Sequence, residues 1–200
     1  MIIVGPPGSG KGTQAERISQ QLGIPAISTG DIFRQNIAQL TPLGVNCKNY
    51  IDKGDLVPDD LTNQMVRQRL RQPDALDGFL LDGYPRTTTQ VAELDDMLSF
   101  NNLTLDAALL LTVDDADLVT RLLERAKTTR RSDDTETVIR HRLDLYHQQT
   151  EQLIDLYRAR GVLLTVDGNV AIDEVTEQIT AQISSVDTSS QLVTQVAGQS

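Results

Sequence analysis

The chain has only one cysteine, Cys47, and no tryptophan among its 200 residues. A single cysteine excludes both a disulfide within the chain and a cysteine zinc cluster. No apolar stretch approaches the roughly 20 residues that a membrane-spanning helix needs. Residues 1–4 form a strand-like run without the basic region or cleavage site of a signal peptide. We therefore expect a cytoplasmic protein that holds no zinc and does not bind membranes.

Basic residues are also scarce, and most of them are arginine. The formal net charge is −10 at pH 7, and the chain has 14 arginines against 4 lysines. This excess of negative charge argues against general binding to nucleic acid or to anionic membranes. An arginine guanidinium binds phosphate with two parallel N–H groups, so the composition still allows a small anionic ligand in a local basic pocket.

Five short apolar runs predict the strands of a parallel sheet. Each run is brief, lacks alternation of polar and apolar residues, and is bounded by Gly, Pro or Asp, which is typical of strands buried on both faces. The runs span residues 2–4, 26–28, 79–81, 107–113 and 162–166. Apolar residues at helical spacing occupy 13–22, 116–126, about 135–160 and 173–183. This alternation predicts an α/β fold, a doubly wound five-stranded parallel sheet flanked by helices.

Two segments depart from the alternation. Residues 31–57 have a helical pattern broken by Pro42, Gly44 and Gly54, which predicts a small helical insertion. Residues 184–200 are rich in Ser, Thr, Gln and Val, carry one charge and show no clear period, so we expect a flexible tail there. The prediction is therefore one domain over residues 1–183, with the insertion at about 30–57 inside it.

A glycine-rich loop joins the first expected strand to the first expected helix. Residues 5–13 read Gly-Pro-Pro-Gly-Ser-Gly-Lys-Gly-Thr. In such a phosphate-binding loop (P-loop), glycines let backbone N–H groups surround a phosphate, and Lys11 adds a positive charge. The general pattern has Ser or Thr directly after the lysine, whereas here Gly12 intervenes and the hydroxyl comes at Thr13. The loop predicts nucleotide binding but does not decide the reaction, because ATPases, GTPases and many kinases share it.

Segments after the P-loop indicate the reaction, because they resemble the motifs of a known enzyme family. Residues 5–15, 28–34 (Ser-Thr-Gly-Asp-Ile-Phe-Arg), 54–59 (Gly-Asp-Leu-Val-Pro-Asp) and 78–87 (Gly-Phe-Leu-Leu-Asp-Gly-Tyr-Pro-Arg-Thr) resemble motifs of nucleoside monophosphate kinases, in particular adenylate kinases. Gln90, Arg121, Arg125, Arg131, Asp133-Asp134 and Arg142 follow in the order and spacing of that family. The resemblance covers about residues 1–180. It implies reversible, Mg²⁺-dependent phosphoryl transfer, ATP + AMP = 2 ADP, by a monomer.

The resemblance also assigns roles to individual residues. It places the catalytic side chains around the transferring group: Lys11, Arg86, Arg125, Arg131 and Arg142. It gives the ATP site Gly8, Ser9, Gly10, Lys11, Gly12, Thr13, Arg121, Arg125 and Val170. It gives the AMP site Thr29, Arg34, Asp55, Leu56, Val57, Gly83, Tyr84, Pro85, Arg86, Gln90, Arg131 and Arg142. Asp82 closes a strand as a Walker B acid does and is expected to hold Mg²⁺ through water.

Only five residues separate Arg125 from Arg131, so the chain resembles the short form of the family. We expect a lid loop at about 126–132 in place of a lid domain. We also expect the helical insertion to make a larger hinge movement than this loop. A UMP/CMP kinase is an alternative, but Thr29 favours AMP because those enzymes usually carry Ala there. A nucleotide-binding sensor without catalysis is a second alternative, which the full set of arginines disfavours. His141 and His147 fall on a long expected helix with no partner pattern in the sequence, and we interpret both as structural or surface residues.

Overall fold

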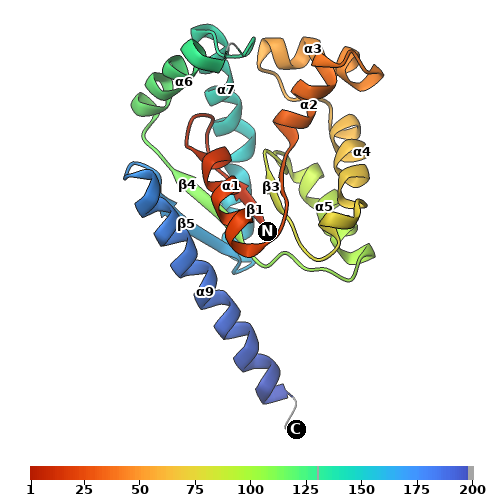
Figure 1. Ribbon diagram of the computed structural model, residues 1–200, viewed down its shortest axis with the longest axis vertical. Coiled ribbons are helices and arrows are strands. Elements are labelled where there is room, and N and C mark those ends of the chain that lie inside the picture. The colour runs from red at the N-terminus through yellow and green to blue at the C-terminus, as the bar shows by residue number, and fades with distance from the viewer. Residues whose placement is uncertain (130, 198–200) are drawn as a thin grey trace.

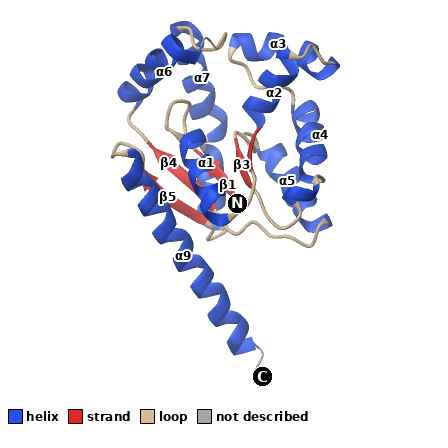
Figure 2. Cartoon of the chain, in the orientation of Figure 1, coloured by secondary structure: helices blue, strands red, loops and turns tan. Residues whose placement is uncertain are grey.

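The computed structural model describes residues 1–129 and 131–197, with side chains as far as residue 185. Within this part of the chain, five parallel strands form one sheet in the order β2-β3-β1-β4-β5. The strands are β1 (Ile2–Val4), β2 (Ala26–Ser28), β3 (Leu80–Asp82), β4 (Ala108–Thr112) and β5 (Leu163–Asp167). Helices cover both faces of the sheet (Figure 2). The predicted five-stranded parallel sheet flanked by helices is confirmed.

The helices follow the strands in alternation, with an all-helical segment between β2 and β3. Their bounds are α1 (Lys11–Leu22), α2 (Thr29–Ala38), α3 (Pro42–Lys53), α4 (Asp59–Leu70), η1 (Pro73–Ala75), α5 (Thr88–Phe100), α6 (Asp115–Thr129), α7 (Glu136–Leu145), η2 (Tyr146–Thr150), α8 (Gln152–Ala159) and α9 (Ile172–Ala197). Among the described helices, none combines the length and the apolar character required to cross a membrane.

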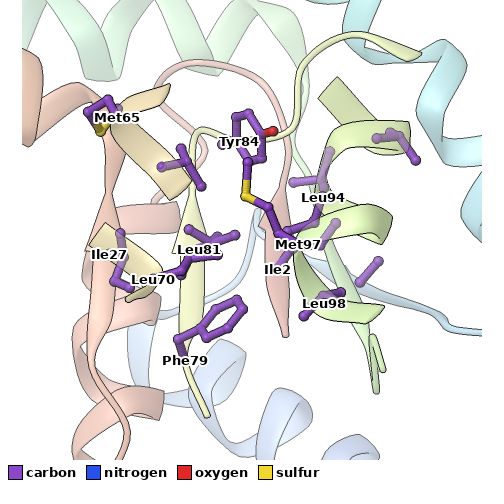
Figure 3. Packing of buried hydrophobic residues seen from close by; sticks show 14 of the residues in the cluster. Ile2, Ile27, Met65, Leu70, Phe79, Leu81, Tyr84, Leu94, Met97 and Leu98 are labelled. Carbon is purple, nitrogen blue, oxygen red and sulfur yellow. The ribbon is translucent and has the colours of Figure 1, made fainter. Parts of the chain in front are cut away.

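Four of the strands, β1, β3, β4 and β5, contribute to two hydrophobic cores, because successive side chains of a strand point to opposite faces of the sheet. On one face, Ile2, Ile27 and Leu81 pack with residues of α4, α5 and α8. Figure 3 shows labelled members of this core from β1, β2, β3, α4 and α5. On the other face, Ile3 and Leu109 pack with residues of α1 and α9. Burial on both faces explains why the apolar runs do not alternate.

The helix expected over about 135–160 is formed by α7, the π-helical turn η2 (Tyr146–Thr150) and α8. A π turn inserts a residue and rotates the side chains that follow it. Tyr146 and Thr150 both line the large cavity described below. The hydroxyl of Thr150 also donates to the backbone carbonyl of Arg86 at 3.3 Å. The first and last residues of the π turn therefore both contribute polar side chains to the site.

Two expected boundaries differ from the structure. Helix α6 continues to Thr129, so residues 126–129 are its last turn and not part of a lid loop. The hydroxyls of Thr128 and Thr129 donate back to the carbonyl of Arg125, within the same helix. Helix α9 continues past the expected end at residue 183 to Ala197, and its second half extends away from the body of the molecule (Figure 1). Flexibility of residues 184–197 stays a prediction, and 198–200 lie outside the described residues.

The helical insertion corresponds to α2 and α3, which meet at a tight corner. Thr41 caps α3 by accepting a hydrogen bond from the backbone of Gly44 at 3.1 Å, and Pro42 occupies the first turn. Gly44 is buried against α2. A Cβ at this position would overlap the carbonyl of Asn36 and lie 2.5 Å from the backbone nitrogen of Ile37. The close approach of the two helices thus depends on a residue without a side chain.

We expect Gly44→Ala to destabilise the protein by about 1–3 kcal/mol or more, because the added methyl group must push α2 and α3 apart. Urea unfolding measures the change. Asn46→Ala is a matched control, since Asn46 is exposed on the same helix, and it should change the free energy of unfolding by less than about 0.5 kcal/mol. Equal stability of Gly44→Ala and the unsubstituted protein would contradict the packing of α2 on α3.

Candidate active site

A cavity of about 410 Å³ lies at the carboxyl ends of β1 and β3. Figure 1 shows α2 and α3 on one side of this edge of the sheet, and α6 and α7 on the other. Ligands of open parallel sheets bind at this edge, where loops and helix N-termini converge. Sixteen of the expected site residues line the cavity: Gly8, Gly10, Lys11, Gly12, Thr13, Arg34, Leu56, Asp82, Gly83, Tyr84, Pro85, Arg86, Arg121, Arg125, Arg131 and Arg142.

The P-loop is shaped to receive an anion. Gly8 has φ +88, and a Cβ there would lie 2.9 Å from Cγ of Leu122 on α6, so a larger residue does not fit. Helix α1 starts at Lys11 with no side-chain cap and no acidic residue in its first turn. Its N-terminal N–H groups therefore remain available to a phosphate.

Lys11 lies folded over the loop. Its ammonium donates to the carbonyls of Gly5 and Pro6, both at 2.7 Å. Burial lowers the pKa of Lys11 to about 8. Asp82 opposes this shift, whereas Arg86 and other arginines add to it. A phosphate beside the ammonium would stabilise the charged form and reverse the shift.

The lowered pKa of Lys11 predicts a pH dependence. We expect kcat/KM for ATP to fall about tenfold per pH unit above about pH 8, because kcat/KM reports the free enzyme. The turnover number at saturating ATP should persist to higher pH, since bound phosphate raises the pKa. Parallel pH profiles of kcat/KM and kcat would contradict this assignment to Lys11.

The lowered pKa of Lys11 also affects how stability depends on pH. Between about pH 8 and 10.5 the folded protein binds fewer protons at Lys11 than the unfolded chain does, so Lys11 makes the free energy of unfolding rise with pH in this range.

Six arginines line the cavity, and the four expected to be catalytic come from different elements: Arg86 after β3, Arg125 on α6, Arg131 in the following loop and Arg142 on α7. Burial lowers the pKa of Arg86, Arg131 and Arg142, and neighbouring arginines lower each further. Arginine nevertheless stays protonated in proteins. The cavity is thus a desolvated cluster of positive charge that favours a polyanionic ligand.

Two buried carboxylates hold two of these arginines in place. Asp134 accepts from Nε and Nη2 of Arg125 at 2.9 and 2.6 Å, a two-pronged pair. Asp133 accepts from Nη1 of Arg142 at 2.7 Å, and Asp134 approaches the same nitrogen at 3.3 Å. The exposed fractions of Asp133 and Asp134 are only 4% and 5%. The arginine side chains are therefore preorganised by charge-assisted hydrogen bonds.

A smaller cavity adjoins the first and shares lining residues with it. Arg34, Arg86 and Arg142 line both cavities, so they lie between them. The remaining expected residues of the smaller cavity are Thr29, Asp55, Leu56, Val57, Gly83 and Gln90. Thr29 is buried at the start of α2, and its hydroxyl donates to the carbonyl of Asp82 at 3.3 Å. Gln90, on α5, is only 2% exposed.

Two expected site residues line neither cavity. Ser9 is a buried residue of the P-loop itself, with its hydroxyl 3.4 Å from the ammonium of Lys11. Val170 is partly buried and packs against the core on the α1 and α9 side of the sheet. It follows Gly168, whose carbonyl accepts from Arg121 at 3.0 Å. Val170 thus lies near an arginine of the cavity without reaching the cavity itself.

Both histidines, interpreted from the sequence as structural or surface residues, have acidic partners in the structure. His141 Nε2 lies 2.6 Å from Asp55 in the loop that follows α3. His147 lies 3.2 Å from both Asp115 and Glu151, and its pKa is raised by these carboxylates against the effect of burial. Glu151 stands four residues after His147, a spacing visible in the sequence, whereas Asp55 and Asp115 are brought in by the fold.

Comparison with known proteins agrees with this geometry. A model of the family described as "Adenylate kinase" matches residues 3–162. Proteins named adenylate kinase from Pseudarthrobacter chlorophenolicus and Renibacterium salmoninarum are each 63% identical to this chain. Those alignments cover 90% and 93% of this chain, and 93% and 96% of the relatives. A protein of the same name from Thermobifida fusca is 50% identical over 89% of this chain and 94% of the relative. The chain therefore belongs to the adenylate kinase family.

Proposed function

We propose that this chain transfers the γ-phosphoryl group of ATP to AMP, reversibly, to give two molecules of ADP. The observation that carries the proposal is the pair of adjoining cavities that share Arg34, Arg86 and Arg142. In this proposal the larger cavity binds ATP, with the P-loop around its phosphates. The smaller cavity binds AMP, with its phosphate toward the shared arginines. A phosphate acceptor thus lies beside a phosphate donor.

The transfer exchanges one P–O bond for another. An oxygen of the AMP phosphate attacks the γ-phosphorus, and the bond from that phosphorus to the bridging oxygen of ATP breaks. No general base is required, because a phosphate monoester is mostly dianionic at neutral pH, with a second pKa of about 6. In this scheme Lys11, Arg86, Arg125, Arg131 and Arg142 orient the two substrates and stabilise negative charge on the transferring group.

Contacts across the cleft support exclusion of water from the reaction. Ser132 donates to Asp52 at the end of α3 at 2.6 Å. His141 lies 2.6 Å from Asp55, and Arg131 lies 3.7 Å from Asp31 on α2. These pairs join the helical insertion to α7 and to the loop before it. With both sides joined, water has less access to the γ-phosphate, which limits wasteful hydrolysis.

Members of this family generally use Mg²⁺ together with ATP, and Asp82 suits such an ion. Asp82 lines the large cavity at the end of β3, and its Oδ2 would lie 3.9 Å from a Cβ at Gly12 in the P-loop. Magnesium is commonly bound by one or two carboxylates, substrate phosphates and several waters. We propose that Asp82 holds the ion through water, where it would neutralise phosphate charge. We also propose a cytoplasmic monomer.

The proposed function is tested by supplying Mg·ATP with AMP, CMP, UMP or GMP separately and measuring nucleoside diphosphate formation. We expect rapid turnover with AMP alone, and little ATP consumption in a sample without acceptor. Preference for CMP or UMP would keep the phosphotransfer mechanism but contradict the assignment of AMP. ATP binding without transfer to any monophosphate would contradict catalysis altogether.

A further inference from the structure

The side-chain amide of Gln90 is held at both ends. Its Oε1 accepts a hydrogen bond from the backbone N–H of Arg86 at 2.7 Å. Its Nε2 donates to Oδ1 of Asp59 at 2.7 Å. Gln90 lines the smaller cavity, whereas Asp59, at the start of α4, lines neither cavity. Asp59 therefore reaches the site only through other residues.

These two partners allow one orientation of the amide. A carboxylate accepts hydrogen bonds and does not donate them, and a backbone N–H only donates. Turning the amide over would place two acceptors together at Asp59 and two donors together at Arg86. The second oxygen of Asp59 accepts from the hydroxyl of Thr87 at 3.0 Å, which fixes the carboxylate in turn. Thr87 is itself held as the cap of α5, accepting from the backbone N–H of Gln90 at 3.2 Å.

A fixed amide distinguishes bases by their pattern of donors and acceptors. Beyond its two bonds to protein, the Gln90 amide retains one N–H and one acceptor position. An adenine edge offers an amino donor beside a ring-nitrogen acceptor, which an amide in the right orientation satisfies in pairs. A 6-oxo purine presents the reverse order, an acceptor beside a ring N–H. The orientation of the Gln90 amide therefore determines whether it pairs with the edge of a 6-amino purine or with that of a 6-oxo purine.

We propose that Asp59 is a positioning residue that sets the preference for 6-amino over 6-oxo purines by holding the orientation of the Gln90 amide. The proposal rests on the proposed function, in which AMP occupies the smaller cavity. Asp59 touches no substrate in this scheme. Its contribution should appear in the choice of base and in the affinity for AMP, and not in the chemical step or in the binding of ATP.

The test is Asp59→Ala, which removes the acceptor. Initial rates are measured with Mg·ATP and either AMP or IMP, its 6-oxo counterpart, on the same enzyme sample. We expect the ratio of kcat/KM for AMP over IMP to fall by about tenfold or more, as for loss of one hydrogen bond to a charged group. KM for AMP should rise by a similar factor, whereas KM for ATP should change by less than about twofold.

Three further variants separate positioning from a merely structural role. Asp59→Asn keeps an oxygen acceptor and should restore most of the base preference. Asp60→Ala is the matched control, because Asp60 is exposed and shares the first turn of α4, so it tests loss of an acidic residue there. In a Gln90→Met background, adding Asp59→Ala should have little further effect on the AMP/IMP ratio, because Asp59 acts through Gln90.

The outcomes distinguish this inference from the proposed function. Failure of the unsubstituted enzyme to use AMP, or to prefer it over IMP, would overturn both. An intact preference in Asp59→Ala, or an equal loss in the Gln90→Met background, would overturn only the role of Asp59. Partial unfolding does not obscure the result, because the AMP/IMP ratio is independent of the fraction of active enzyme.

Discussion

Replacing Arg86 by alanine is expected to lower kcat by about 10³- to 10⁵-fold, the range found when an arginine that stabilises a transferring phosphoryl group is removed. Arg86 lines both cavities, and its Nε donates to the carbonyl of Gly83 at 2.9 Å, which restrains the guanidinium. No carboxylate is bonded to it among the described residues. Its removal therefore leaves no buried acid unpaired, and the loss should be one of catalysis and not of folding.

Arg140→Ala is the control for Arg86→Ala. Arg140 is exposed on α7 and pairs with Glu136 one turn earlier, away from the cavities. Its replacement should leave kcat within about twofold and stability within about 0.5 kcal/mol, as for most surface changes. Single-turnover rates and urea unfolding measure both properties. Equal losses of activity in the two variants would contradict a catalytic role for Arg86.

Replacing Lys11 by methionine is expected to lower kcat by about 10²- to 10³-fold, as when one preorganised donor to a developing charge is lost. Stability should behave differently from activity. The pKa of Lys11 is lowered to about 8, mainly by burial, which means that the folded protein disfavours the charged ammonium. Methionine fills similar space without that charge, so the free energy of unfolding at pH 7 should stay equal or increase.

Lys53→Met supplies the comparison for Lys11→Met. Lys53 is exposed at the end of α3 and lies outside the lining of both cavities. Steady-state kinetics should show no loss of turnover for this variant. A Lys11→Met protein that keeps its turnover would contradict a role in the reaction. Strong destabilisation would show instead that the hydrogen bonds from the ammonium to the carbonyls of Gly5 and Pro6 outweigh the cost of burying the charge.

The buried strands and the P-loop were predictable from local sequence, because burial on both faces and backbone conformation leave strong local signals. The ends of helices that continue beyond the expected boundary, and irregular turns within a helix, were not predictable. Residues 126–129 contain no helix breaker, so α6 runs through them, and the expected lid loop is shorter. The π turn at Tyr146–Thr150 has no breaker either, and its residues fit a regular helix equally well. Local pattern does not distinguish these cases.

Partnerships made by the tertiary fold account for the rest of the site. The expected arginines were identified by resemblance, and they meet at one cavity. The carboxylates that hold them, Asp133 and Asp134, had no assigned role, since pairing nine residues apart leaves no helical spacing to read. Asp59 is separated from Gln90 by 31 residues, and only the packing of α4 beside α5 brings them together.

The most direct test of phosphoryl transfer between the two cavities follows the fate of the γ-phosphate. The enzyme is supplied with γ-labelled ATP and with AMP carrying isotopic carbon in its adenine, and the products are separated. We expect two ADP molecules for each ATP consumed, with the γ label on the ADP that carries the labelled adenine and none in inorganic phosphate. Label released as inorganic phosphate, or ATP consumed at the same rate without AMP, would contradict the proposed arrangement of donor and acceptor.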